Sequence, residues 1–213
     1  MTVPSEGKKN SFILRVLDVI ISASALIVTT PLLAILAIAV RFDVGRPIFF
    51  RQARLGLEGL PFAFVKFRTM TNACDSNGEL LDDDLRVTRL GRFLRKTSLD
   101  ELPSLWLVLN GTMSMIGPRP LPVDYLPRMT TGQRRRFNVL PGISGLAQVN
   151  GRTSLGWEER LKLDVEYLER MSLILYLGLL CKTIAVILSR CGADSHEAGP
   201  FPWFSEHRDD KRR

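Results

Sequence analysis

The 213-residue sequence is poor in histidine and cysteine. Its two histidines, His196 and His207, lie in the C-terminal tail, which argues against a zinc site or a Ser-His-Asp or Cys-His catalytic centre in the body of the chain. The three cysteines, Cys74, Cys181 and Cys191, form no CxxC pair, which indicates reduced thiols rather than a disulfide framework. We therefore expect any chemistry to depend on carboxylate, lysine and arginine side chains.

Aromatic residues are also few, at 8% of the chain, and no nucleic-acid-binding motif is present. Basic residues outnumber acidic ones by 29 to 22, which gives a formal charge of +7 and favours an anionic partner. Without aromatic-rich or nucleic-acid motifs, a lipid surface or a phosphorylated small molecule is the expected partner, and a nucleic acid is not. Hydrophobic residues make up 46%, enough for a folded core.

The longest apolar run, residues 19–40, has 22 residues without a charge, and a spanning helix needs about 20. Pro31 follows Thr29 and Thr30 in the middle of this run and favours a kink or break, where the two hydroxyls could bond freed carbonyls. Basic residues flank the run on both sides, which favours the cytoplasmic face for both ends. A re-entrant helix-break-helix and a kinked spanning helix therefore both remain open. A cleaved signal peptide is rejected because the run continues well past its small-residue segment.

A second apolar run, residues 173–188, is shorter and contains Lys182. These features predict a helix lying in the membrane interface or a helix buried in the core, rather than a spanning helix.

Between the two runs the sequence predicts a compact mixture of helices and strands. Residues 48–50 and 62–67 favour a β-hairpin, and residues 75–78 a turn. Residues 158–169 predict an amphipathic helix with apolar residues on one stripe. Arginines recur at every third position from residue 86 to residue 95. They are expected to be solvated helix faces, salt-bridge partners for neighbouring aspartates, or a phosphate-binding group: Arg86, Arg89, Arg92 and Arg95.

The segment at residues 97–103, TSLDELP, can be interpreted in two ways. Ser98 and Glu101 have the spacing of a capping box, which would be purely structural. Pro103 instead favours a helix that starts at or just before Asp100, because proline is tolerated only in the first turn. In either case Asp100 and Glu101 lie at a helix N-terminus, where backbone N–H groups favour an anion.

Four strings in order, KFRTM at 66–70, RKTSLDELP at 95–103, MSMIGPRP at 113–120 and PGISGLAQVNGR at 141–152, follow the proline-containing apolar run. Over residues 12–190 the chain resembles the bacterial sugar transferases, the small monotopic polyprenyl-phosphate phosphoglycosyl transferases. The resemblance implies an α+β, mostly helical fold. It also implies a monotopic membrane protein with a re-entrant helix broken at Thr30 and Pro31, a small β-hairpin and amphipathic interfacial helices.

The resemblance further implies a bacterial enzyme on the cytoplasmic face of the inner membrane that uses Mg²⁺, a UDP-sugar and polyprenyl (undecaprenyl) phosphate. Asp100 would attack the sugar-linked phosphorus and release UMP, and polyprenyl phosphate would then attack the phosphosugar-aspartate. Asp100 and Glu101 are the catalytic and metal-binding candidates. The phosphate-binding candidates are basic residues of the matching strings: Lys66, Arg68, Arg95, Arg119 and Arg152.

We divide the chain into a membrane hairpin at residues 1–45, a catalytic domain with interfacial helices at 46–191, and a C-terminal tail at 192–213. The sugar and the glycan pathway are not specified, and a homodimer is left open. Four residues depart from the family pattern, which usually has Asn, an acid, Arg and Asp there: Leu107, Thr112, Leu140 and Tyr176.

Two other functions are compatible with the residues. Asp82, Asp83 and Asp84 could form the metal motif of a glycosyl transferase that releases UDP, although no βαβ nucleotide-binding pattern accompanies them. A membrane scaffold without activity is the other alternative, because of the four departures.

Overall fold

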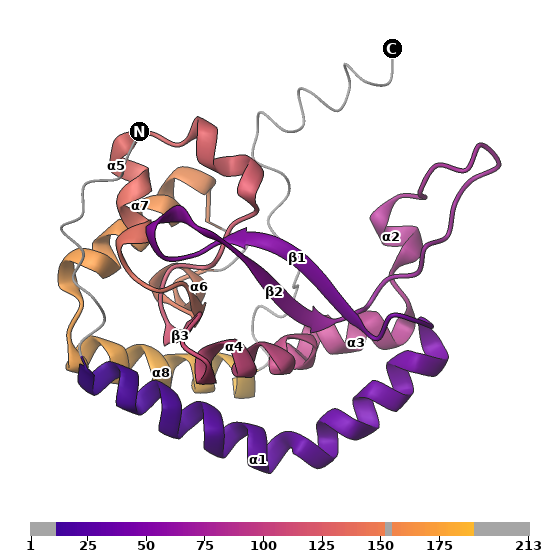
Figure 1. Ribbon diagram of the computed structural model, residues 1–213, viewed down its shortest axis with the longest axis horizontal. Helices are drawn as coiled ribbons and strands as arrows, with labels where there is room; N and C mark the ends of the chain where they lie inside the picture. Colours follow the sequence, from indigo (N-terminus) through magenta and orange to yellow (C-terminus); the bar gives the residue numbers. More distant parts are fainter. Residues whose placement is uncertain (1–11, 152–154, 190–213) are drawn as a thin grey trace.

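One long helix begins the part of the chain that the structure describes. In this computed structural model, which describes residues 12–151 and 155–189, α1 spans Phe12–Asp43 and is continuous through Pro31. It bends near its middle (Figure 1), as expected for a helix that contains a proline. The predicted helix-break-helix is therefore a bent helix, without an interruption in the helical backbone.

Pro31 has no N–H, so one carbonyl in the preceding turn lacks its helical donor. We expected the Thr29 and Thr30 hydroxyls to bond this carbonyl, and they do not. Thr29 and Thr30 instead donate to the carbonyls one turn before them, those of Ala25 and Leu26, both at 2.7 Å. Such back-bonding from threonine commonly accompanies helix bending, because it competes with the backbone ladder.

The outer surface of α1 is apolar and exposed. Its length and hydropathy are sufficient to cross a membrane, and several large apolar side chains along it are more than half exposed: Phe12, Ile13, Ile20, Ile27, Val28, Ile35, Ile38 and Phe42. An apolar surface of this extent marks contact with a membrane or a partner.

The predicted β-hairpin is confirmed and is longer than expected. β1 (Phe49–Leu55) and β2 (Pro61–Phe67) pair antiparallel, and η1 (Leu57–Gly59) forms the connection. The hairpin crosses the middle of the molecule above α1 (Figure 1).

The arginine-rich segment at residues 86–95 is divided between two short helices. α2 (Asp83–Arg86) ends at Val87, and α3 (Arg89–Thr97) begins after Thr88, whose hydroxyl accepts a hydrogen bond from the Gly91 N–H at 2.8 Å. The break arises because this side-chain cap starts a new helix.

The segment around the two acidic residues is a 3₁₀ helix, η2 (Leu99–Ser104), which continues into α4 (Leu105–Leu109). Ser98 has a left-handed backbone (φ 58°) as the C-cap of α3 and makes no side-chain cap bond, so the capping-box interpretation is wrong. A helix that starts just before Asp100 is confirmed.

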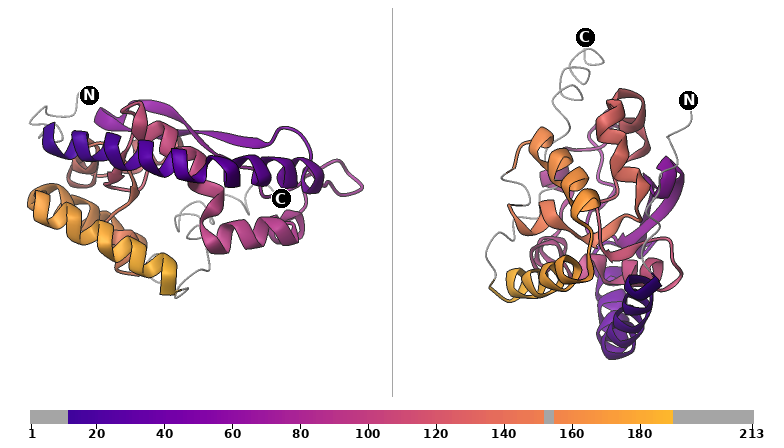
Figure 2. Two further views of the ribbon diagram at one scale, coloured as in Figure 1. Left: turned by 90° about the horizontal axis from the view of Figure 1, so that it is seen from below. Right: turned by 90° about the vertical axis from the view of Figure 1, so that its left-hand side faces the viewer.

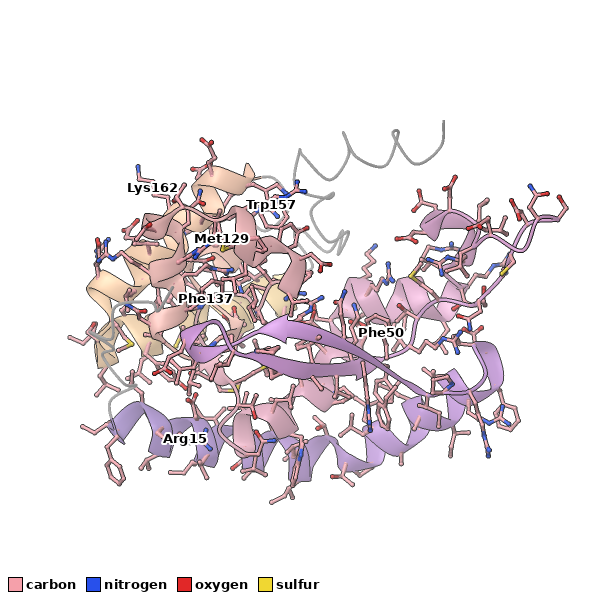
Figure 3. The ribbon with its side chains drawn as sticks, turned by 45° about the horizontal axis from the view of Figure 1, so that its top comes forward. Arg15, Phe50, Met129, Phe137, Trp157 and Lys162 are labelled. Carbon is pink, nitrogen blue, oxygen red and sulfur yellow. The ribbon has the colours of Figure 1, made fainter. Side chains whose placement is uncertain are left out.

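The remaining elements lie mainly at the end of the molecule away from α2 and α3 (Figure 1). They are β3 (Ser114–Ile116), η3 (Val123–Arg128), α5 (Thr131–Arg134), η4 (Arg135–Asn138), β4 (Gly142–Ser144), α6 (Leu146–Val149), α7 (Trp157–Arg170) and α8 (Leu173–Ser189). β3 and β4 pair in parallel, and α7 confirms the predicted amphipathic helix. One apolar cluster of this end includes Met129, Phe137 and Trp157 (Figure 3).

α8 has one buried and one exposed apolar side. Tyr176 and Leu179 are buried, whereas Ile174, Ile184 and Ile187 are at least half exposed. The described part of α8 is thus not wholly buried, which favours the interfacial alternative. α1 and α8 lie towards the same side of the molecule, with the hairpin and α5 to α7 above them (Figures 1 and 2).

Two polar residues attach the first half of α1 to this body. Arg15 donates to the carbonyls of Val108 and Leu109 at the end of α4, at 2.5 and 2.8 Å. Asp18 is fully buried and accepts hydrogen bonds from the Met115 N–H at 2.8 Å and the Tyr176 hydroxyl at 2.7 Å.

Candidate active site

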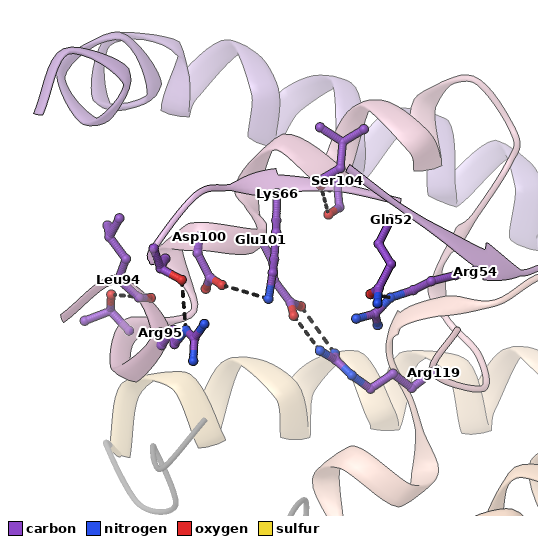
Figure 4. Close-up of polar contacts among 12 residues, drawn as sticks. Gln52, Arg54, Lys66, Leu94, Arg95, Asp100, Glu101, Ser104 and Arg119 are labelled. Atoms are coloured by element: carbon purple, nitrogen blue, oxygen red, sulfur yellow. Dashed lines mark hydrogen bonds and ion pairs between the residues drawn. The ribbon is translucent and has the colours of Figure 1, made fainter. Parts of the chain in front are cut away.

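The acidic pair is held beneath the β-hairpin. η2 packs on β2, where the Ser104 hydroxyl donates to the Val65 carbonyl at 2.8 Å. The adjacent residue of β2, Lys66, extends towards Asp100, and its Nζ lies 3.8 Å from the carboxylate (Figure 4). The hairpin therefore supplies a cation to the carboxylate that η2 presents.

Glu101 forms the stronger ion pair of the site. Arg119 Nη2 lies 2.6 Å from one oxygen of Glu101, and Nη1 lies 3.4 Å from the other (Figure 4). A guanidinium that faces both oxygens of a carboxylate fixes orientation as well as charge. Glu101 is thus held in place, and it fixes the side chain of Arg119 in return.

The two adjacent carboxyls titrate differently. Burial raises the pKa of Asp100 to about 6, the charge of Glu101 adds to the rise, and Lys66, Arg119 and Arg95 offset only part of it. Burial also opposes ionisation of Glu101, but the charge and hydrogen bonds of Arg119, with smaller contributions from Lys66 and Arg54, leave its pKa below its ordinary value. Two neighbouring acids with separated pKa values are typical of a catalytic site.

Three further phosphate-binding candidates occupy different positions. Arg95, in the last turn of α3, donates to the Thr69 hydroxyl at 2.9 Å, and its charge reaches Asp100. Arg68 donates to the carbonyls of Met70 and Arg46 and to the Asn72 side chain, so here it braces the loop after β2. Arg152 lies outside the described residues.

The double-proline turn at residues 117–120 is held by hydrogen bonds to its backbone. The Pro118 carbonyl accepts from the Gly142 N–H at 2.9 Å, and the Pro120 carbonyl accepts from Arg54 Nη1 at 3.0 Å. Between them, the Arg119 carbonyl accepts from Arg136 Nη2 at 2.7 Å. The Gly117 N–H also donates to the Ser144 carbonyl at 2.8 Å, so the turn is fixed along its whole length although its two prolines have no N–H.

Sequence reasoning missed four charged residues near Arg119: Arg54, Arg136, Arg160 and Asp164. The charge of Arg54 helps to lower the pKa of Glu101. Burial lowers the pKa of Arg160, and the charge of the nearby Arg119 lowers it further. Asp164 forms a buried ion pair with Arg136 at 2.6 Å. The spacing of Arg160 and Asp164, four apart in a predicted amphipathic helix, was the available signal, but it is also typical of a solvated ion pair.

The departures from the family pattern are accommodated in the structure. Leu107 is buried in an apolar cluster, and the Thr112 N–H is bonded by the Asn110 side chain at 3.0 Å. Tyr176, where the family usually has an acid, donates its hydroxyl to Asp18 and so avoids placing two carboxylates together. We have no structural explanation for Leu140.

The acidic run of the rival metal motif serves a local role. Asp82, Asp83 and Asp84 are exposed around the start of α2, and Asp83 pairs with Arg86 at 2.5 Å. The salt-bridge interpretation of this run is thus confirmed for Asp83.

No cluster of three or more metal-ligating side chains occurs within residues 12–151 and 155–189. Asp100 and Glu101 do provide two hard oxygen donors at one place. Mg²⁺ commonly takes one or two protein carboxylates and completes its shell with water and substrate phosphates, so this donor set fits magnesium.

Comparisons with known proteins identify relatives of this chain. The chain is 48% identical over 174 residues to the uncharacterized sugar transferase EpsL of Bacillus subtilis (strain 168), covering 82% of this chain and 86% of that protein. It is 39% identical to a UDP-glucose:undecaprenyl-phosphate glucose-1-phosphate transferase of Klebsiella pneumoniae, covering 80% of this chain and 39% of that protein. It is 36% identical to the undecaprenyl-phosphate galactose phosphotransferase of Salmonella typhimurium, covering 87% of this chain and 42% of that protein.

The chain therefore corresponds to most of the first relative and to about two fifths of the other two. The family model described as bacterial sugar transferase matches residues 9–190, which include both apolar helices, the hairpin and the acidic pair. The chain belongs to the bacterial sugar transferase family.

Proposed function

We propose that this protein transfers a sugar 1-phosphate from a UDP-sugar to undecaprenyl phosphate and releases UMP. The observation that carries the proposal is the Asp100–Glu101 pair, with Asp100 buried and Glu101 partly buried, surrounded by Lys66, Arg95 and Arg119. The relatives named as undecaprenyl-phosphate sugar phosphotransferases support it, because the chain matches them over most of its own length.

Asp100 is the proposed nucleophile. One of its oxygens forms a bond to the sugar-linked phosphorus of the UDP-sugar, and the bond from that phosphorus to the bridging oxygen breaks. UMP leaves with the bonding electron pair. An oxygen of undecaprenyl phosphate then attacks the same phosphorus, the Asp100 oxygen leaves, and the carboxylate is restored. A carboxylate nucleophile divides one phosphoryl transfer into two easier steps.

Burial suits Asp100 to this role, because a poorly solvated carboxylate loses little hydration when it attacks. Glu101 keeps its charge through Arg119, so it is suited to orienting the reactants. The cations facing the pair would offset the negative charge of the two phosphorylated reactants.

Magnesium belongs to the proposal as the expected cofactor. Asp100 and Glu101 would hold it together with the substrate's phosphate oxygens. When bound, the ion neutralises charge on the transferring phosphoryl group.

The membrane assignment is also proposed, with α1 entering the bilayer from the cytoplasmic face and returning to it. The bend of α1, its exposed apolar surface and its attachment to the body through Arg15 and Asp18 support this topology. The helices on either side of the acidic pair each present an exposed aromatic residue, Phe93 at 53% and Trp106 at 60%. Aromatic side chains of this kind are common at membrane interfaces, where a lipid-linked substrate would be reached.

The test is the identity of the nucleotide product. Purified protein in detergent, given Mg²⁺, undecaprenyl phosphate and a panel of UDP-sugars that includes UDP-glucose and UDP-galactose, should release UMP. UDP as the stoichiometric product would refute the proposal and favour the rival metal-dependent glycosyl transferase.

Asp100→Asn should abolish UMP release, whereas Asp84→Asn, in the acidic run of the rival motif, should retain it. Wild-type protein given UDP-sugar alone should accumulate a phosphosugar adduct that peptide mass analysis places on Asp100. An adduct on another residue would show that the nucleophile is assigned wrongly.

A further inference from the structure

A buried ion pair lies behind the active-site arginine and outside the acidic pair. Arg136, in η4, is only 2% exposed, and its Nη2 lies 2.6 Å from Asp164 Oδ2 on α7. The same nitrogen donates to the backbone carbonyl of Arg119 at 2.7 Å. One guanidinium nitrogen therefore joins α7 to the double-proline turn.

Stability alone explains this arrangement poorly. Removing two charges from water costs several kcal/mol per ion, and well-packed apolar residues often do as well or better. Arg136 Nε and Nη1 are buried and have no hydrogen-bond partner within residues 12–151 and 155–189, which adds to the cost. What the buried charge does provide is a directional bond to one carbonyl.

That carbonyl belongs to the residue that holds Glu101. Pro118 and Pro120 flank Arg119 and restrict its backbone, so a shift of the Arg119 carbonyl moves the Cα that carries the guanidinium. The guanidinium is in turn paired with both oxygens of Glu101. A chain of contacts thus runs from Asp164 through Arg136 and Arg119 to Glu101, and a shift of Arg136 would displace the Arg119 guanidinium.

We propose that Arg136, oriented by Asp164, is a positioning residue that sets the place of Arg119 and so the rate of sugar-phosphate transfer, without contacting substrate. This inference rests on the proposed function. It assigns to α7 a part in the reaction, although α7 contributes no residue to the acidic pair or its cations.

The chain provides a matched control that joins the same two elements. Arg135 on η4 pairs with Glu169 on α7 at 2.9 Å, but both side chains are about half exposed. Exposed pairs contribute little to stability. Arg135→Lys and Glu169→Gln should therefore leave UMP release within about twofold of wild type, because neither residue is linked to the double-proline turn.

Arg136→Lys keeps the positive charge but replaces a planar fork with a single ammonium group, which cannot reproduce both contacts. We expect it to lower kcat/KM for UMP release by about 10- to 100-fold, the loss that small displacements of catalytic groups produce. Asp164→Asn should have an effect in the same direction. Thermal unfolding of each variant shows whether it is folded.

A double-mutant cycle separates positioning from simple structural support. If Arg136 acts through Arg119, then Arg136→Lys should cost less than about threefold in an Arg119→Lys background, because the group that it positions is already altered. An equal cost in both backgrounds would overturn the inference. So would an effect of Arg136→Lys no larger than that of Arg135→Lys.

A second measurement does not depend on activity. The rate at which phenylglyoxal modifies Arg119, followed by peptide mass analysis, should rise several-fold in Arg136→Lys and stay unchanged in Arg135→Lys. An unchanged rate at Arg119, or an equal rise at every arginine, would refute the positioning role. Wild-type protein that releases no UMP would refute the proposed function, and the modification rates would then decide the positioning role alone.

Discussion

The burial of Asp100 predicts that its removal stabilises the folded protein. The Asp100 pKa rises from 3.8 to about 6 because burial disfavours the charged carboxylate, with the neighbouring Glu101 charge adding to the effect. A group whose pKa is higher in the folded state binds more protons there, so stability falls as pH rises through the window from about 4 to about 6. Above that window the shift corresponds to roughly 3 kcal/mol of lost stability.

Asp100→Asn removes this loss while keeping the size of the side chain. The favourable charge of Lys66 is already contained in the net pKa, so it does not cancel the expected gain. We expect the variant to be more stable than wild type by about 2–3 kcal/mol at pH 7.5, and the advantage to vanish near pH 4. At about 2–4 °C per kcal/mol, the unfolding midpoint should rise by about 4–12 °C at pH 7.5.

Thermal unfolding in detergent across this pH range, without Mg²⁺ or nucleotide, measures the difference. Asp84→Asn is the matched control, since it removes an exposed carboxylate at the start of α2. An Asp100→Asn variant that is no more stable than wild type at pH 7.5, or equally stabilised at every pH, would refute this account of the site.

Three other predictions concern catalysis, packing and topology. Because Asp100 must be ionised to attack, kcat/KM for UMP release should fall about tenfold per pH unit below the pKa of Asp100, which is about 6 without metal and lower when Mg²⁺ is bound; a profile that does not fall at acidic pH would contradict the assignment. Arg15→Met removes two charge-assisted hydrogen bonds to the end of α4 and should lower the free energy of unfolding by about 1–3 kcal/mol, whereas Arg41→Met, exposed on the same helix, should have little effect in thermal unfolding. Replacing Thr30 and Pro31 together by alanine should straighten α1 and favour spanning. With native cysteines removed, a cysteine ahead of α1 should react with an impermeant maleimide on intact cells only in this variant, and labelling in the native helix would contradict the re-entrant topology.

The predictions from sequence succeeded where local pattern decides structure. The hairpin at residues 48–67 and the helix at 158–169 were expected from β-propensity and from apolar periodicity, and both are confirmed. The capping box at Ser98 was wrong because that residue instead ends α3. A helix cap depends on a single residue, and serine and threonine side chains can bond several different backbone groups near them, so the sequence alone does not show which cap forms.

The sequence by itself determined the family strings, the acidic pair, the surrounding excess of basic residues and the apolar run that ends at residue 40. Only the tertiary structure decided which basic residue serves which partner. Arg68 and Arg119 stand in equally suggestive strings, yet one braces a loop while the other holds Glu101. The structure also buries Arg136 against Asp164, 28 positions apart, although each belongs to a segment that looks solvated in sequence. Charge pairing depends on distance and burial, and the packing of separate elements creates both.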